Sequence, residues 1–76
     1  MKYREFVYIP SEEVKEMICA ILAKGGWRYN FHPPIPFYLY APEMKGDDHL
    51  GWDTVPYTDD GRYTQIGINE VLRDET

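Results

Sequence analysis

The sequence has little cysteine, no long apolar run and few positive charges, and each shortage excludes a class of protein. Cys19 is the only cysteine among 76 residues, so an intrachain disulfide is excluded. The longest unbroken apolar run, Met17 to Ala23, is far shorter than a membrane-spanning helix. No basic segment followed by an apolar one opens the chain. These features predict a cytoplasmic protein with no membrane partner.

The shortage of positive charge also limits the choice of partner. Eight lysines and arginines stand against thirteen acidic residues, which gives a net charge of −5. Nucleic-acid affinity is built mainly from Lys and Arg contacts to phosphate, so we do not expect a nucleic-acid partner. Residues 43–60 alone carry the whole imbalance, with Lys45 against Glu43, Asp47, Asp48, Asp53, Asp59 and Asp60. These loops are either simply solvated or face a basic partner.

A chain of this length forms a single domain, 1–76, because it can bury only about 60% of its unfolded surface. The strongest periodic signal predicts an amphipathic helix over about 11–24. Ser11 is a good N-cap residue, and Glu12 and Glu13 follow in the first turn. The apolar stripe repeats at helical spacing in Val14, Met17, Ile18, Ile21 and Leu22.

The segment 27–42 concentrates six aromatic rings and four prolines. Rings alternate with polar residues over 27–32 and again over 37–41, which predicts two strands joined by a stiff proline-rich connector. We expect one alternating set to be core: Trp27, Phe31, Phe37 and Leu39, with Tyr29 beside them. The opposite set, Tyr38 and Tyr40 with Arg28 and His32, should then be exposed.

Three further segments complete the predicted fold. Residues 3–9 are β-branched and aromatic and predict a first strand. Residues 52–58 and 62–68 flank Asp59-Asp60-Gly61, which predicts a hairpin. Residues 69–73 either prolong the last strand or form a helical turn. The fold class is therefore α+β, with one helix packed on a small antiparallel sheet of four to five strands.

The spacing of acids, histidines and cysteine predicts no metal and no cofactor. Asp47, Asp48 and His49 are adjacent, but a calcium loop needs alternate acids and a closing glutamate. A zinc site would have to draw on His32, His49 and Cys19, which lie in three separate elements. Cys19 also lacks the basic neighbours that activate a thiol.

The exposed tyrosines and the acidic loops together favour a protein-binding module. Tyrosine and arginine are enriched at interface hot spots, which favours a binding surface formed by Arg28, His32, Tyr38, Tyr40, Asp47, Asp48, Asp53, Asp59 and Asp60. Such a compact acidic chain would suit a stoichiometric inhibitor or regulator of a basic partner protein. The comparison with inhibitors encoded by phages and mobile elements is an analogy.

Two other functions remain open from the sequence. A small hydrolase or nuclease could use His32 and His49 as bases, oriented by Asp47, Asp48 or Asp53. A homodimeric structural protein could instead join through the small residues Cys19, Ala20 and Ala23, which lie opposite the apolar stripe of the helix.

Overall fold

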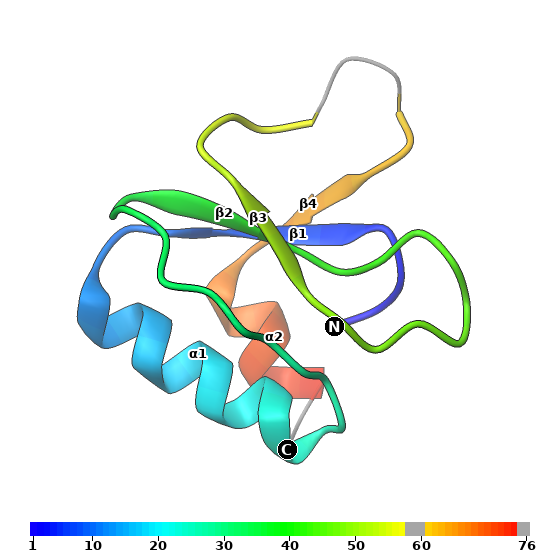
Figure 1. The fold of residues 1–76 in the computed structure, drawn as a ribbon, viewed down its shortest axis with the longest axis horizontal. Helices are drawn as coiled ribbons and strands as arrows, with labels where there is room; N and C mark the ends of the chain where they lie inside the picture. Colours follow the sequence, from blue (N-terminus) through cyan, green and yellow to red (C-terminus); the bar gives the residue numbers. More distant parts are fainter. Residues whose placement is uncertain (58–60, 75–76) are drawn as a thin grey trace.

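The computed structural model describes residues 1–57 and 61–74, so Asp59 and Asp60 of the predicted turn lie outside the described residues. The elements follow in the order β1 (Glu5–Ile9), α1 (Glu12–Lys24), β2 (Phe37–Tyr40), β3 (Gly51–Asp53), β4 (Thr64–Ile66) and α2 (Ile68–Asp74). Both helices lie on one side of the four-stranded sheet (Figure 1). The predicted α+β class is confirmed, and the C-terminal segment is a helix rather than a strand.

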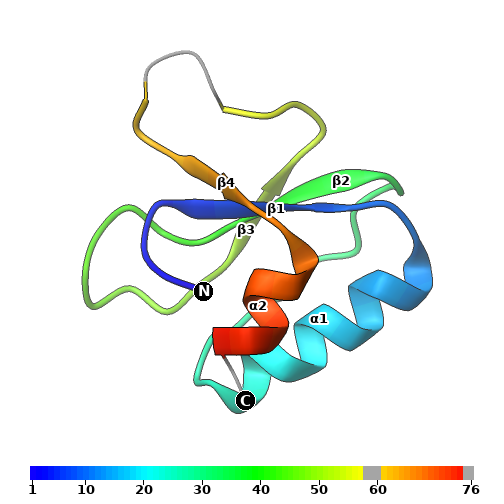
Figure 2. The ribbon, with the colours of Figure 1, turned by 180° about the vertical axis from the view of Figure 1, so that it is seen from behind.

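The sheet is mixed, which corrects the prediction that it is wholly antiparallel. Its strand order is β3-β2-β1-β4, with β2 antiparallel to both β1 and β3. β4 pairs with β1 in parallel, and Val7 lies opposite Ile66. β3 and β4 form opposite edges of the sheet, and the described residues that connect them, 54–57 and 61–63, lie on the side of the sheet away from the helices (Figures 1 and 2).

The predicted hairpin of 52–58 and 62–68 is therefore wrong, because β3 and β4 lie on opposite edges of the sheet. β3 ends where the carboxylate of Asp53 accepts hydrogen bonds from the N–H groups of Thr54 and Val55. Pro56 then has no N–H to donate to a strand partner. Tyr57 and Tyr63 do meet, with ring centroids 5.6 Å apart, but both rings pack on Tyr40 and neither residue belongs to a strand.

The predicted strand over 27–32 is also wrong. Arg28 forms only an isolated bridge, in which its N–H donates to the carbonyl of Asp48 and its carbonyl accepts from Leu50, at 2.7 and 2.8 Å. β3 already occupies the edge of β2, so this segment runs beside the 48–50 loop instead. Trp27 and Phe31 still pack partly buried against the core, whereas Tyr29 is exposed.

Helix α1 begins as predicted, since the Ser11 hydroxyl accepts a hydrogen bond from the N–H of Val14 at 3.3 Å. Its buried side differs from the predicted stripe: Cys19 is only 1% exposed, whereas Met17 is exposed. The reason is α2, which packs beside α1 and adds Val71 to the same core (Figure 2). Cys19 thus cannot be part of an outer dimer face.

The main core lies between the helices and the inner face of the sheet. Its fully buried members include Val7, Ile9, Ile18, Leu22, Phe37, Leu39 and Val71. Burial raises the pKa of the Cys19 thiol within this core, which disfavours the reactive thiolate. Neither of the described helices has the length and apolar character needed to cross a membrane.

Candidate functional site

The outer face of the sheet, away from the helices, carries a cluster of aromatic rings. The outer ring cluster comprises Phe6, Tyr8, Tyr38, Tyr40, Tyr57 and Tyr63. Tyr40 lies at its centre, stacked on Phe6 at 4.9 Å and on Tyr57 at 4.4 Å between ring centroids. Tyr63 meets Tyr40 edge-on at 5.3 Å. The loop after β3 thus covers one end of this face.

Tyr40 is buried, which corrects the expectation that it is exposed. Only 5% of its surface is accessible, and its hydroxyl donates a 2.8 Å hydrogen bond to the carbonyl of Val55. Burial raises the pKa of Tyr40 to about 12, because the phenolate would lose its hydration. The ring of Tyr40 therefore holds the loop onto the sheet and has little surface left for a partner.

The other end of the outer face, here called the bare end, is open to solvent. It combines aromatic rings with a carboxylate. Tyr8 is 39% exposed and lies 5.1 Å from the half-buried ring of Tyr38. Asp53 is the strand neighbour of Tyr38 and accepts a hydrogen bond from the Tyr57 hydroxyl. That bond lowers the pKa of Asp53, with a further lowering from the backbone N–H groups of Thr54 and Val55, and the same bond raises the pKa of Tyr57. Asp53 is therefore a fixed negative charge at neutral pH.

A second group of charged side chains lies around the Arg28 bridge. Arg28 Nε is 3.2 Å from a carboxylate oxygen of Asp48, and His49 Nδ1 is 3.6 Å from the other oxygen. Asp47 accepts the backbone N–H of His49 at 3.0 Å. Asp47, Asp48 and His49 bring ligand atoms within 4.8 Å of one another, a geometry that a cation could use. All three are at least partly open to solvent, and Arg28 already neutralises Asp48.

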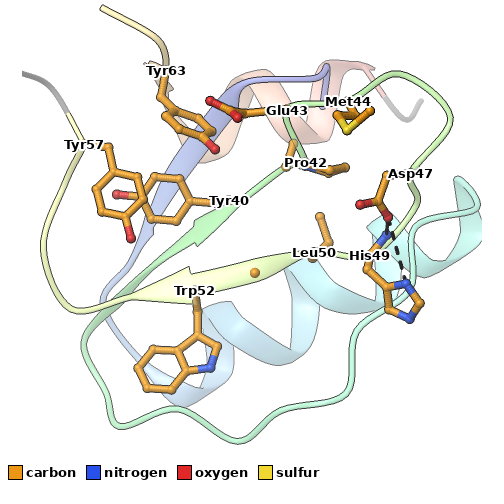
Figure 3. Close-up of a pocket in the computed structure, with 12 residues that line it drawn as sticks. Tyr40, Pro42, Glu43, Met44, Asp47, His49, Leu50, Trp52, Tyr57 and Tyr63 are labelled. Atoms are coloured by element: carbon orange, nitrogen blue, oxygen red, sulfur yellow. Dashed lines mark hydrogen bonds and ion pairs between the residues drawn. The ribbon is translucent and has the colours of Figure 1, made fainter. Parts of the chain in front are cut away.

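A groove of about 390 Å³ runs between these two regions. Tyr40, Tyr57 and Tyr63 form one wall, and Asp47 and His49 stand at the opposite end (Figure 3). The remaining labelled side chains of the lining are Pro42, Glu43, Met44, Leu50 and Trp52. Gly51 also lines the groove, and a side chain added there would project into open space. We call this site the aromatic–acidic groove.

The structure gathers only part of the predicted binding surface. Tyr40 and Asp47 line the groove, Tyr38 and Asp53 adjoin it on the outer face, and Arg28 and Asp48 lie beside His49. His32 is exposed in the connector before β2 and does not line the groove, whereas His49 does. Asp59 and Asp60 are outside the described part of the chain.

Several residues that line the groove were not predicted as site residues, among them Glu43, Met44, Tyr57 and Tyr63. Glu43 could have been identified from the acidic surplus of residues 43–60. Tyr57 and Tyr63 could have been identified from their positions on either side of the predicted turn. No feature of the sequence marked Met44 as a site residue. Its side chain is 75% exposed in the structure.

Comparisons of the chain with protein-family models, with curated proteins and with solved structures found no match.

Proposed function

We propose that the protein is a cytoplasmic binding module that grips a basic surface of a partner protein and acts as its stoichiometric inhibitor or regulator. The observation that supports this is the aromatic–acidic groove, in which Glu43 lies beside the tyrosine rings and Asp47 lies at the opposite end. Among the described residues that line it there is no lysine and no arginine. Such a surface attracts cationic groups and repels acidic ones.

The bare end of the outer face adds a second region to the proposed binding surface, next to the groove. Tyr8 and Tyr38 offer aromatic contact area, and Asp53 adds a charge held in place by Tyr57. Tyrosine provides a large contact area with few rotatable bonds, which is why it is common at interface hot spots. We propose that binding blocks the partner sterically, while the acidic residues steer the approach of the two proteins.

The test is capture of the partner from native host lysate, followed by kinetics on the purified pair. Electrostatic steering predicts that the association rate constant falls at least about tenfold between low and high salt. Glu43→Gln/Asp47→Asn/Asp48→Asn should flatten this dependence. Glu13→Gln/Glu16→Gln removes charge from exposed positions on α1 and should leave it steep. A rate that does not change with salt would contradict the proposal.

A second candidate function is hydrolysis, because His49 does lie beside two carboxylates at the end of the groove. An imidazole oriented by an aspartate can act as a general base. Para-nitrophenyl acetate and bis-para-nitrophenyl phosphate are suitable test substrates. A hydrolase should turn one of them over and lose nearly all activity in His49→Ala, whereas a binding module should show no turnover and keep its partner affinity in that variant.

A further inference from the structure

We propose that β4 is a self-association edge, along which a second copy of this chain adds its own β4 in antiparallel orientation. A two-fold axis would pass beside Gln65, and the two sheets would join into one. This surface is separate from the aromatic–acidic groove, so the inference goes beyond the proposed function and does not depend on it.

The hydrogen bonds of β4 leave one side of the strand open. Among the strands that the structure describes, β4 has a neighbour only on the side of β1. The N–H of Thr64 donates to the carbonyl of Arg4 at 2.8 Å, which places Thr64 and Ile66 among the residues that bond toward β1. Alternate residues of a strand direct their N–H and C=O groups to opposite sides, so those of the exposed Gln65 point away from β1.

The sequence around β4 lacks the charges and prolines that usually protect a sheet edge. Between Arg62 and Glu70 there is no charged residue and no proline, although 28% of the residues in the chain are charged. The opposite edge has both devices, because Asp53 is the last residue of β3 and Pro56 follows it. Charges and prolines on an edge strand prevent it from pairing with another chain. β4 is therefore the edge to which a further strand can be added.

The order of residues in β4 suits a second copy of the same strand. With Gln65 opposite Gln65 of the second copy, each backbone N–H would donate to the carbonyl of the other, as in a hydrogen-bonded pair of antiparallel strands. The same register places Tyr63 of one copy opposite Gly67 of the other, where no side chain takes up space. Thr64 then meets Ile66, a pair of β-branched residues that suits a sheet. The two-fold axis makes each of these off-axis contacts occur twice.

The charge and the size of the chain agree with this contact. Each copy carries a net charge of −5, and the uncharged stretch around β4 keeps that charge out of the interface. A domain of 76 residues has a small core, and chains near this size often gain stability by oligomerisation. The other possible occupant of the edge is an extended segment of a different protein, and the experiment separates the two.

The experiment is sedimentation equilibrium of the full chain at protein concentrations from about 5 to about 500 µM. The parent protein should approach twice the mass of one chain at the upper end. Gln65→Pro removes only an N–H that points away from β1, a position at which an edge strand tolerates proline. This variant should stay folded by circular dichroism and sediment as a monomer. A parent protein that is monomeric throughout overturns the inference.

A lysine at the same position gives a second test with a matched control. Gln65→Lys places two like charges opposite each other across the axis and should weaken association at least about tenfold. Ala20→Lys adds the same charge at an exposed position on α1 and should associate like the parent protein. If Ala20→Lys dissociates the dimer and Gln65→Lys does not, the two copies join through α1 and the inference is wrong.

Amide hydrogen exchange locates the contact in the parent protein. Exchange of the Gln65 amide should slow as the protein concentration rises, whereas the Thr64 amide should be protected at every concentration by its bond to Arg4. A Gln65 exchange rate that does not depend on concentration would show that this edge stays open. If the parent protein is monomeric and Gln65→Pro weakens its binding to the captured partner, the edge takes an extended segment of that partner, which overturns self-association but leaves the proposed function standing.

Discussion

The two faces of the sheet differ in the kind of side chain that they carry and in what covers them. The inner face is mainly aliphatic and lies under two helices, with Val7, Ile9 and Leu39 fully buried. The outer face is aromatic, and among the described residues Tyr57 and Tyr63, which lie outside the helices and strands, cover one end of it. Helices bring continuous apolar surface to a sheet, whereas a loop must also satisfy the polar atoms that it buries.

On the outer face, tyrosine side chains meet this requirement, because each ring carries a hydroxyl that can form a hydrogen bond. Tyr40 bonds to the Val55 carbonyl, and Tyr57 bonds to Asp53. This arrangement covers part of the face without closing it, and Tyr8 stays exposed. The inner face should therefore dominate stability, whereas the outer face should hold the loop in place and offer a surface for recognition.

The largest expected effect is on the inner face. Leu39→Ala removes a fully buried side chain and leaves a cavity, so we expect the free energy of unfolding to fall by about 2–5 kcal/mol. For a domain of this size that is a large part of the total. Urea unfolding followed by circular dichroism measures it. If Leu39→Ala costs no more than the loss of a single hydroxyl on the outer face, the proposed difference between the faces is wrong.

The inner face is also the part that the sequence predicts best. Helix α1, β1 and β2 were predictable because their apolar periodicity and the cap at Ser11 are local properties. The side of α1 that contacts α2 was not predictable in the same way, since Cys19 is buried by an element nearly fifty residues away in the sequence. Local pattern fixes where a helix forms, but tertiary contacts decide which of its sides is covered.

The outer face was predicted less well for a related reason. A turn sequence between two β-like segments normally indicates a hairpin, but here the rings of Tyr57 and Tyr63 pack on Tyr40 instead of continuing two paired strands. The excess of rings was visible in the sequence. What it could not reveal was that the chain's own loop, not a partner, covers Tyr40. The groove follows from that loop and was likewise beyond prediction.

An effect of intermediate size on stability is expected from the hydrogen bond between the Tyr40 hydroxyl and the Val55 carbonyl. Tyr40→Phe keeps the stacked ring and removes only the hydrogen bond to Val55, so we expect a loss of about 1 kcal/mol at neutral pH. Tyr8→Phe removes a hydroxyl from an exposed ring on the same face and should cost less. Equal losses in these two variants would show that the Tyr40 hydroxyl does not anchor the loop.

The dependence of stability on alkaline pH tests the role of Tyr40 in a second way. The pKa of Tyr40 is about 12 in the native protein against an ordinary value of 10, so the native state holds this proton when the unfolded chain has released it. Stability should therefore be fully present below pH 10 and fall as the pH rises toward 12. Tyr57 contributes in the same direction, because its pKa is also raised. Tyr40→Phe should make the decline shallower in urea unfolding at increasing pH, and an unchanged slope would contradict the assignment.

The smallest expected effect on stability lies at the bare end of the outer face. Tyr8→Thr places a residue of high β propensity in β1 and removes an exposed ring, so the free energy of unfolding should change by only about 0.5 kcal/mol. If the bare end serves recognition, the same variant should slow capture of the partner or speed its release, measured by surface plasmon resonance. A variant that loses stability but keeps its affinity would reverse these roles, because Tyr8 would then complete a second core instead of meeting a partner. The two measurements on one substitution therefore separate an exposed ring that supports the fold from one that serves binding.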